Sequence, residues 1–134
     1  MDLEKGGDYQ GIGAHITGVR VVELWATWCG PCVAGLPDLE RLAARWAGSG
    51  VEVLVVSVDD PKVVFDRYRG FGEHYRPMWG GPGVLRALRL SGVPATFVID
   101  ERGIVRAFQQ GALIGEVEDT RLHRALEAIV GDPG

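Results

Sequence analysis

The sequence predicts an α/β fold in which helices flank a central mixed β-sheet. Two apolar runs, at 21–26 and 51–58, have the composition of strands that are buried on both faces of a sheet. The segment between them has the period of an amphipathic helix. Its apolar positions are Leu36, Leu39, Ala43 and Trp46. A strand, a helix and a second strand in this order predict a parallel βαβ unit.

The end of the chain is predicted to complete the sheet with an antiparallel pair of strands. Apolar stretches at 95–99 and 104–108 flank the loop 100–103. Gly103 in this loop can adopt the left-handed conformation that such a hairpin needs. A last amphipathic helix follows. Its apolar face consists of Leu122, Ala125, Leu126 and Ile129.

The middle of the chain is predicted to contain two further helices. Acidic residues followed by Pro61 are typical of a helix start, and we expect this helix to span about 61–69. A short helix is expected at 84–90. Glycines and two prolines predict irregular structure at 70–83.

Length and composition indicate an ordinary globular protein. The chain has 134 residues, and we expect a single domain over 1–134 with an irregular N-terminal segment at 1–18. The net charge is −4 and the basic residues are scattered, which argues against nucleic-acid binding. No apolar run approaches the roughly 20 residues that cross a bilayer. We expect a monomer without a membrane span.

The N-terminal residues do not decide between cellular compartments. They are polar and rich in glycine, without the charged and then apolar pattern of a signal peptide. We expect a cytoplasmic protein if the chain is complete as written. If an export segment has been removed, we expect the periplasm or the cell surface.

The only two cysteines, Cys29 and Cys32, follow a predicted strand and open a predicted helix. A helix N-terminus has free N–H groups and a partial positive charge, which stabilise a thiolate. Residues three apart in a first turn face the same side and can form a disulfide. We expect Cys29 to attack a substrate disulfide and Cys32 to resolve the mixed disulfide. Gly30 and Pro31 form the intervening loop, where Pro31 suits a first helical turn.

Two other roles remain open for this pair. Two cysteines supply only half of the ligands of a structural zinc site, and the three histidines are too dispersed in the sequence to complete one. The pair could also consist of inert core cysteines, although a disulfide across so short a loop stabilises a fold little. Redox chemistry is the favoured interpretation, with the Cys29–Cys32 disulfide as the only redox group and no metal or other cofactor.

The segment 26–32, Ala-Thr-Trp-Cys-Gly-Pro-Cys, resembles the active-site motif of the thioredoxin superfamily, and most closely that of TlpA/ResA-like proteins. Pro37 matches the proline within the family's active-site helix. The resemblance implies a thioredoxin fold. It also implies an extra βα insertion between the Cys-X-X-Cys helix and the loop at Pro94, because 62 residues separate Cys32 from Pro94 (94 − 32).

The same resemblance assigns substrate contacts. Gly92-Val93-Pro94 matches the family's cis-proline loop, which lies beside the cysteines. The backbone of Val93 is then available to pair with an extended substrate segment. The alternative is a trans proline that starts a strand. Trp28 is expected to shield the cysteines or to contact the substrate.

Glu23 lies within the first apolar strand, six residues before Cys29. Burial there would raise its pKa and allow it to exchange a proton with Cys32. Its position is similar to that of the buried aspartate of thioredoxin. The alternative is a carboxylate that points into solvent near a strand end.

The resemblance implies an enzyme that reduces protein disulfides and receives electrons from an upstream donor. Its substrates in the similar family include apocytochromes c and copper-site proteins. The Gly30-Pro31 dipeptide matches thioredoxin and favours the reducing direction. A peroxide-reducing relative would need Pro and Thr upstream, where Val22 and Ala26 stand. A copper(I) carrier or chaperone on the same fold is the main alternative.

Overall fold

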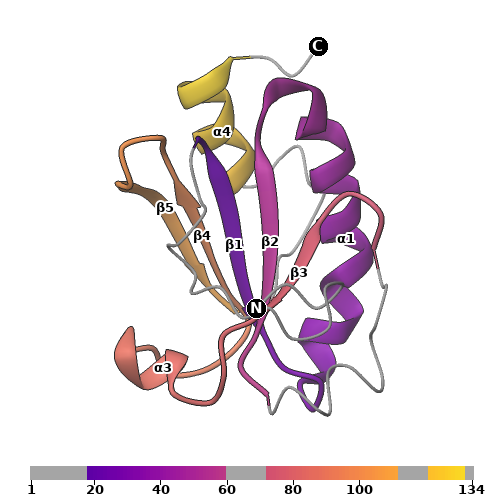
Figure 1. Cartoon of the computed structure of the whole chain (residues 1–134), viewed down its shortest axis with the longest axis vertical. Coiled ribbons are helices and arrows are strands. Elements are labelled where there is room, and N and C mark those ends of the chain that lie inside the picture. The colour runs from indigo at the N-terminus through magenta and orange to yellow at the C-terminus, as the bar shows by residue number, and fades with distance from the viewer. Residues whose placement is uncertain (1–17, 60–71, 112–120, 132–134) are drawn as a thin grey trace.

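A computed structural model describes residues 18–59, 72–111 and 121–131 (Figure 1). These residues form one five-stranded sheet with the strand order β3-β2-β1-β4-β5. The strands are β1 (Arg20–Trp25), β2 (Glu52–Ser57), β3 (Arg76–Trp79), β4 (Ala95–Ile99) and β5 (Val105–Gln110). The predicted mixed sheet flanked by helices is confirmed.

The centre of the sheet is the predicted βαβ unit. Strands β1 and β2 are parallel, with Val21 opposite Val53 and Trp25 opposite Ser57. Five of the six residues in each of these strands are buried, which explains why both read as continuous apolar runs. Strand β4 pairs antiparallel with β1 and places Thr96 opposite Glu23.

Helix α1 (Gly30–Trp46) connects β1 to β2 and contains Pro37. Its predicted apolar residues are all almost completely buried, together with Cys32 and Leu42. A short 3₁₀ turn, η2 (Ala47–Ser49), follows, and Gly50 continues the chain with a φ of 76°. A positive φ is unfavourable for residues with a Cβ, so glycine suits this position.

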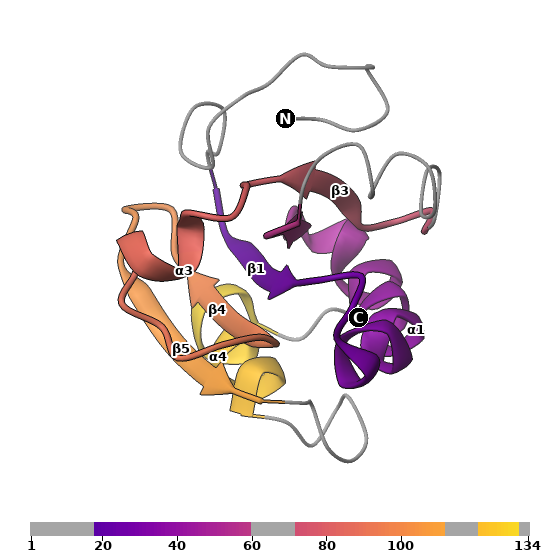
Figure 2. The same cartoon turned by 90° about the horizontal axis from the view of Figure 1, so that it is seen from below.

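The helices lie on both faces of the sheet. Figure 2 shows α1 and α4 (Arg121–Val130) on one face and α3 (Val84–Ala87) on the other. Val22 and Leu24 of β1 line an apolar cavity with residues of α3. Side chains alternate along a strand, so Glu23 points to the face that α1 covers. The α1 face is therefore the one on which a carboxylate can approach the cysteines.

The local residue pattern did not predict strand β3. It is an edge strand that pairs in parallel with β2, and it lies within the stretch 70–83 that we expected to be irregular. It has only four residues, one of which is Pro77. Proline is tolerated in an edge strand, since no second partner needs its missing N–H. Pairing with β2 thus forms a strand that no local pattern signals.

The expected helix at 84–90 is shorter than predicted. Helix α3 ends at Ala87, and Arg89 has a φ of 56°. The N–H of Leu90 donates to the carbonyl of Leu85, at 2.9 Å, and the N–H of Arg89 to that of Arg86, at 3.1 Å. These two bonds form a Schellman motif, which ends a helix. The helix expected at 61–69 and most of the segment 1–18 lie outside the described residues.

The predicted hairpin between β4 and β5 is confirmed. Asp100 closes it, because its Oδ1 accepts the N–H groups of Arg102, at 2.9 Å, and of Ile104, at 3.0 Å. Gly103 has a φ of 84°, as the loop requires. No helix in the described part of the chain has the length and apolar character needed to cross a membrane.

A buried polar contact joins α1 to α4. The indole N–H of Trp46 donates to Nδ1 of His123 at 3.2 Å, and Nε2 of His123 lies 2.8 Å from Glu127. Trp46 is fully buried and His123 is 2% exposed. Because Nδ1 accepts the hydrogen bond from Trp46, the ring carries its hydrogen on Nε2, which donates a hydrogen bond to Glu127. The burial of Trp46 was predicted, but its polar partner was not.

We expect Trp46→Phe to lower the free energy of unfolding by about 2–4 kcal/mol, since it leaves a cavity and an unsatisfied His123 nitrogen. Urea unfolding of the oxidised protein, followed by circular dichroism, measures this loss as a lower midpoint. Trp28→Phe is the matched control, because Trp28 is 71% exposed and should change stability by less than about 0.5 kcal/mol. Equal midpoints for the two variants would contradict the role of this contact.

Candidate functional site

The two cysteines form a disulfide at the N-terminus of α1, with their Cα atoms 5.2 Å apart. Cys29 is the N-cap residue in an extended conformation, and the N–H of Cys32 donates to its Sγ at 3.2 Å. Pro31 lies in the first turn, where its missing N–H would have had no helical partner. The helix N-terminus therefore faces the sulfur of Cys29, where a thiolate would form after reduction.

The two cysteines differ in exposure. Cys29 is 7% exposed and Cys32 is 2% exposed. Cys29 precedes the helix, whereas Cys32 faces the core with Leu36 and Leu39. A substrate can therefore approach the first sulfur more easily than the second. This difference matches the expected division between an attacking and a resolving cysteine.

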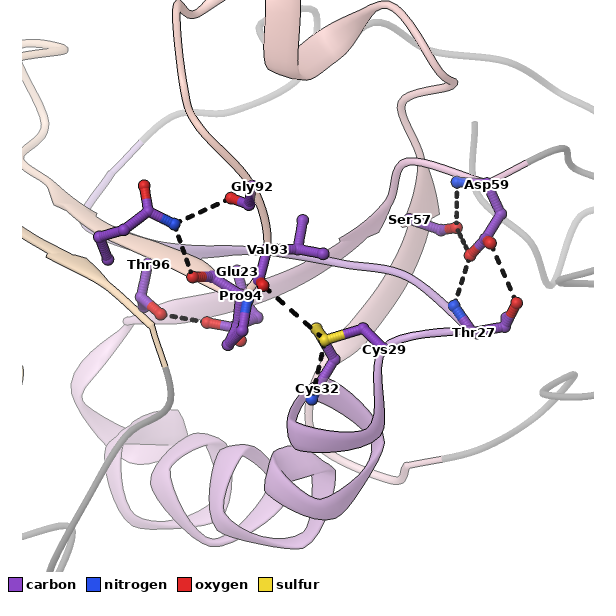
Figure 3. The surroundings of a disulfide bond; sticks show 11 residues. Glu23, Thr27, Cys29, Cys32, Ser57, Asp59, Gly92, Val93, Pro94 and Thr96 are labelled. Atoms are coloured by element: carbon purple, nitrogen blue, oxygen red, sulfur yellow. Dashed lines mark hydrogen bonds between the residues drawn. A yellow bond between two sulfur atoms is a disulfide. The ribbon is translucent and has the colours of Figure 1, made fainter.

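The loop at Pro94 lies directly against the disulfide, and the peptide bond between Val93 and Pro94 is cis. The carbonyl oxygen of Val93 is 3.8 Å from Sγ of Cys29 (Figure 3). A disulfide sulfur has no hydrogen, so this is a contact in the oxidised protein and not a hydrogen bond. The structure thus brings together four of the residues that the sequence predicted for the site, namely Cys29, Cys32, Val93 and Pro94.

Gln110 holds this loop from the end of β5. Its Nε2 donates to the carbonyl of Gly92 at 2.9 Å and to that of Pro94 at 3.1 Å. The N–H of Gly111 also donates to the Pro94 carbonyl, at 2.8 Å. The carbonyl of Val93, which lies between these two, is left for Cys29. Sequence reasoning missed Gln110, since 16 residues separate it from Pro94.

Glu23 is buried, at 4% exposure, and does not point into solvent. Burial raises the pKa of its carboxyl to about 8, and a hydrogen bond from the Thr96 hydroxyl only partly opposes this shift. Thr96 lies two residues after Pro94 and pairs with Glu23 across β1 and β4. Thr96 therefore connects Glu23, inside β1, to the strand that begins directly after the loop that contacts Cys29 (Figure 3).

A second polar group lies on the other side of the disulfide in Figure 3. The carboxylate of Asp59 accepts the N–H of Thr27 at 2.7 Å and the Thr27 hydroxyl at 3.0 Å. It also accepts the hydroxyl of Ser57 at 2.8 Å. The sequence pattern places Asp59 only among the acidic residues that precede Pro61 at a helix start. The signal that could have found it is its place at the end of β2, next to the strand end that leads to Cys29.

Trp28 is exposed on the surface beside the cysteines. Its side chain is 71% accessible, although its neighbours in the sequence are fixed by hydrogen bonds. A large exposed aromatic ring is common at contact surfaces. The position therefore suits a contact with substrate better than a role in shielding the disulfide.

Within the described ranges, one group of side chains has ligand atoms close enough to hold a metal ion. It consists of Glu40, Glu73 and His74. The carboxylate of Glu40 already accepts backbone N–H groups from Glu73 and His74, at 3.0 and 2.8 Å, and this bonding contributes to the lowered pKa of Glu40. These contacts give the group a structural role between α1 and the start of β3.

Comparison with known proteins places these features in a family. A family model described as the AhpC/TSA family matches residues 8–108. The thiol-disulfide oxidoreductase ResA of Geobacillus kaustophilus is 31% identical over 124 residues, which cover 91% of this chain and 66% of the relative. The chain thus spans about two thirds of the length of that relative.

Solved structures agree on the fold. A thiol-disulfide isomerase from Corynebacterium glutamicum superposes with a TM-score of 0.72 at 23% identity, covering 92% of this chain and 88% of the other. A thioredoxin-family thiol:disulfide interchange protein from Chlorobium tepidum gives a TM-score of 0.67 at 26% identity, with 85% and 81% coverage. The fold is therefore thioredoxin-like, and the chain belongs to the AhpC/TSA family within the thioredoxin superfamily.

Proposed function

We propose that this chain is a thiol–disulfide oxidoreductase that reduces protein disulfides through Cys29 and Cys32. The observation that carries the proposal is the position of the Cys29 sulfur, which lies between the N-terminus of α1 and the carbonyl of Val93. The helix N-terminus stabilises the thiolate, and the carbonyl belongs to a backbone segment that can pair with a substrate. The resemblance to ResA supports the same chemistry.

The reaction has two displacement steps. In the reduced protein, the Cys29 thiolate attacks one sulfur of the substrate disulfide, and the other substrate sulfur leaves as a thiolate. The Cys32 thiol then loses its proton and attacks Sγ of Cys29. This step forms the Cys29–Cys32 disulfide and releases the second substrate thiolate, so the substrate gains two electrons that the protein loses.

Glu23 is suited to receive the proton of Cys32. Its carboxyl has a pKa of about 8, which is close to that of an ordinary thiol. Proton transfer between groups of similar pKa is nearly balanced in free energy and can operate in both directions. Glu23 would thus act as a base while the substrate oxidises the two cysteines, and as an acid while an upstream donor reduces them again.

The expected substrates are proteins with an accessible disulfide in an extended segment. Such a segment can form backbone hydrogen bonds with Val93 and can pack against the exposed ring of Trp28. Proteins that receive haem or copper through paired cysteines fit this description once oxidised. A copper(I) carrier is not favoured, because the cysteines are joined in a disulfide and the relatives are named as oxidoreductases.

We expect the Cys29/Cys32 couple to be strongly reducing, at about −270 mV, near the value of thioredoxin. Equilibration with thiol redox buffers, followed by Trp28 fluorescence, measures the potential. Cys29→Ser is the control for fluorescence changes that do not depend on the disulfide. A potential near −120 mV would identify an oxidant. The absence of a reversible couple would contradict oxidoreductase activity altogether.

We expect Glu23→Gln to slow the release of the reduced substrate at pH 8 by at least about 10-fold, because the base for Cys32 is lost. Gln can still accept the hydroxyl of Thr96. In the original protein this rate should rise with pH as Glu23 ionises around pH 8, and the variant should lack this rise. Stopped-flow mixing of the reduced protein with a disulfide peptide measures the rate between pH 6 and 10.

The stability of the same variant provides a control for burial. In the unfolded chain Glu23 ionises near pH 4.5, whereas the folded protein keeps it protonated until about pH 8. The original protein should therefore lose stability relative to Glu23→Gln as the pH rises from 4.5 to 8. A stability difference that is independent of pH would show that Glu23 is not held in its neutral form.

A further inference from the structure

We infer that Asp59 is a positioning residue that holds Cys29 at the N-terminus of α1; the inference rests on the proposed role of Cys29 as nucleophile. Asp59 is 7% exposed and lies two residues beyond β2. Its carboxylate accepts three hydrogen bonds, two of them from Thr27. Asp59 does not contact the reacting sulfurs in these bonds, so it acts through the backbone of the loop.

The loop that leads to Cys29 is a tight turn. The N–H of Cys29 donates to the carbonyl of Ala26 at 3.1 Å, which closes the turn around Thr27 and Trp28. Asp59 holds both the N–H and the hydroxyl of Thr27, at 2.7 and 3.0 Å. Because Thr27 is only two residues from Cys29, this fixes the end of the turn opposite to the helix. Trp28, between the fixed residues, remains 71% exposed.

Asp59 is itself fixed to the sheet. Ser57, the last residue of β2, donates its hydroxyl to the carboxylate at 2.8 Å and accepts the N–H of Asp59 at 3.0 Å. The indole N–H of Trp79, the last residue of β3, donates to the Asp59 carbonyl. The turn before Cys29 is thus connected to the ends of β2 and β3. The N-terminus of α1 holds the other side of Cys29.

This arrangement has a consequence for the reactivity of Cys29. The sulfur gains stabilisation as a thiolate only while it faces the N–H of Cys32 and the positive end of α1. The effect is confined to the first turn of a helix, so a small displacement of Cys29 weakens it. Loss of the contacts to Thr27 would free the turn and reduce the fraction of thiolate at neutral pH.

The test measures the alkylation of Cys29 by iodoacetamide as a function of pH. Every protein compared carries Cys32→Ser, so that Cys29 is the only thiol that can react. We expect Asp59→Ala to raise the pH midpoint of alkylation by about one unit and to slow alkylation at pH 7 by about 10-fold. Asp59→Asn should restore most of the rate, since its amide N–H can donate to the Thr27 oxygen while its carbonyl accepts the Thr27 N–H.

Asp100→Ala is the matched control. Asp100 is also a buried aspartate whose carboxylate accepts backbone N–H groups of a loop, but this loop is the β4–β5 hairpin. It should lower stability without moving the midpoint. An unchanged midpoint in Asp59→Ala would overturn the inference. Equal shifts in Asp59→Ala and Asp59→Asn would also overturn it, because the charge and not the hydrogen-bond geometry would then be responsible.

Thr27→Val keeps the test decisive if Asp59→Ala does not fold. It removes only the hydroxyl contact, and it should raise the midpoint by a smaller amount in the same direction; an unchanged midpoint would contradict the inference. Alkylation needs no substrate disulfide. A protein in which Asp59 controls the midpoint but which reduces no protein disulfide would therefore contradict the proposed function and leave the role of Asp59 intact.

Discussion

The structure depends most on the meeting of the N-terminus of α1 with the end of β1. The buried β1 strand leads into a four-residue turn, and α1 begins at once with its free N–H groups facing the sulfur of Cys29. Burial of the apolar face of α1 against the sheet fixes the helix axis, and the strand fixes where the turn begins. The position of one sulfur atom thus follows from the packing of the whole core.

Two polar contacts refine that position from either side. Asp59 connects the turn before Cys29 to the ends of β2 and β3, while Gln110 holds the loop whose Val93 carbonyl touches the Cys29 sulfur. Both residues lie just after strands or at their ends, where backbone groups lose the partners that a sheet supplies. Glu23 differs, since it lies inside the sheet and its burial changes its acidity. The site therefore combines fixed geometry with one group suited to proton transfer.

Much of this could be predicted from the sequence, because the relevant signals are local. Continuous apolar runs indicated β1 and β2, helical spacing indicated α1, and the Cys-X-X-Cys motif at a helix start indicated the reactive pair. No local pattern indicated strand β3, since four residues with a proline become a strand only by pairing with β2. The roles of Asp59, Gln110 and His123 escaped for a related reason, because each bonds a residue far away in the sequence: Thr27, Pro94 and Trp46 are 16 to 77 residues distant. Such contacts are set by the topology of the sheet and leave no periodic pattern.

In the proposed reaction, Cys29 attacks the substrate and Cys32 resolves the intermediate. Trapping tests it directly: Cys32→Ser, reduced and mixed with a protein disulfide, should accumulate a mixed disulfide at Cys29 that mass spectrometry of the digested complex can locate. Cys29→Ser, treated in the same way, should accumulate little, because Cys32 is less exposed than Cys29, at 2% against 7%. Trapping at Cys32 in preference to Cys29, or no trapping in either variant, would contradict this division of roles between the two cysteines.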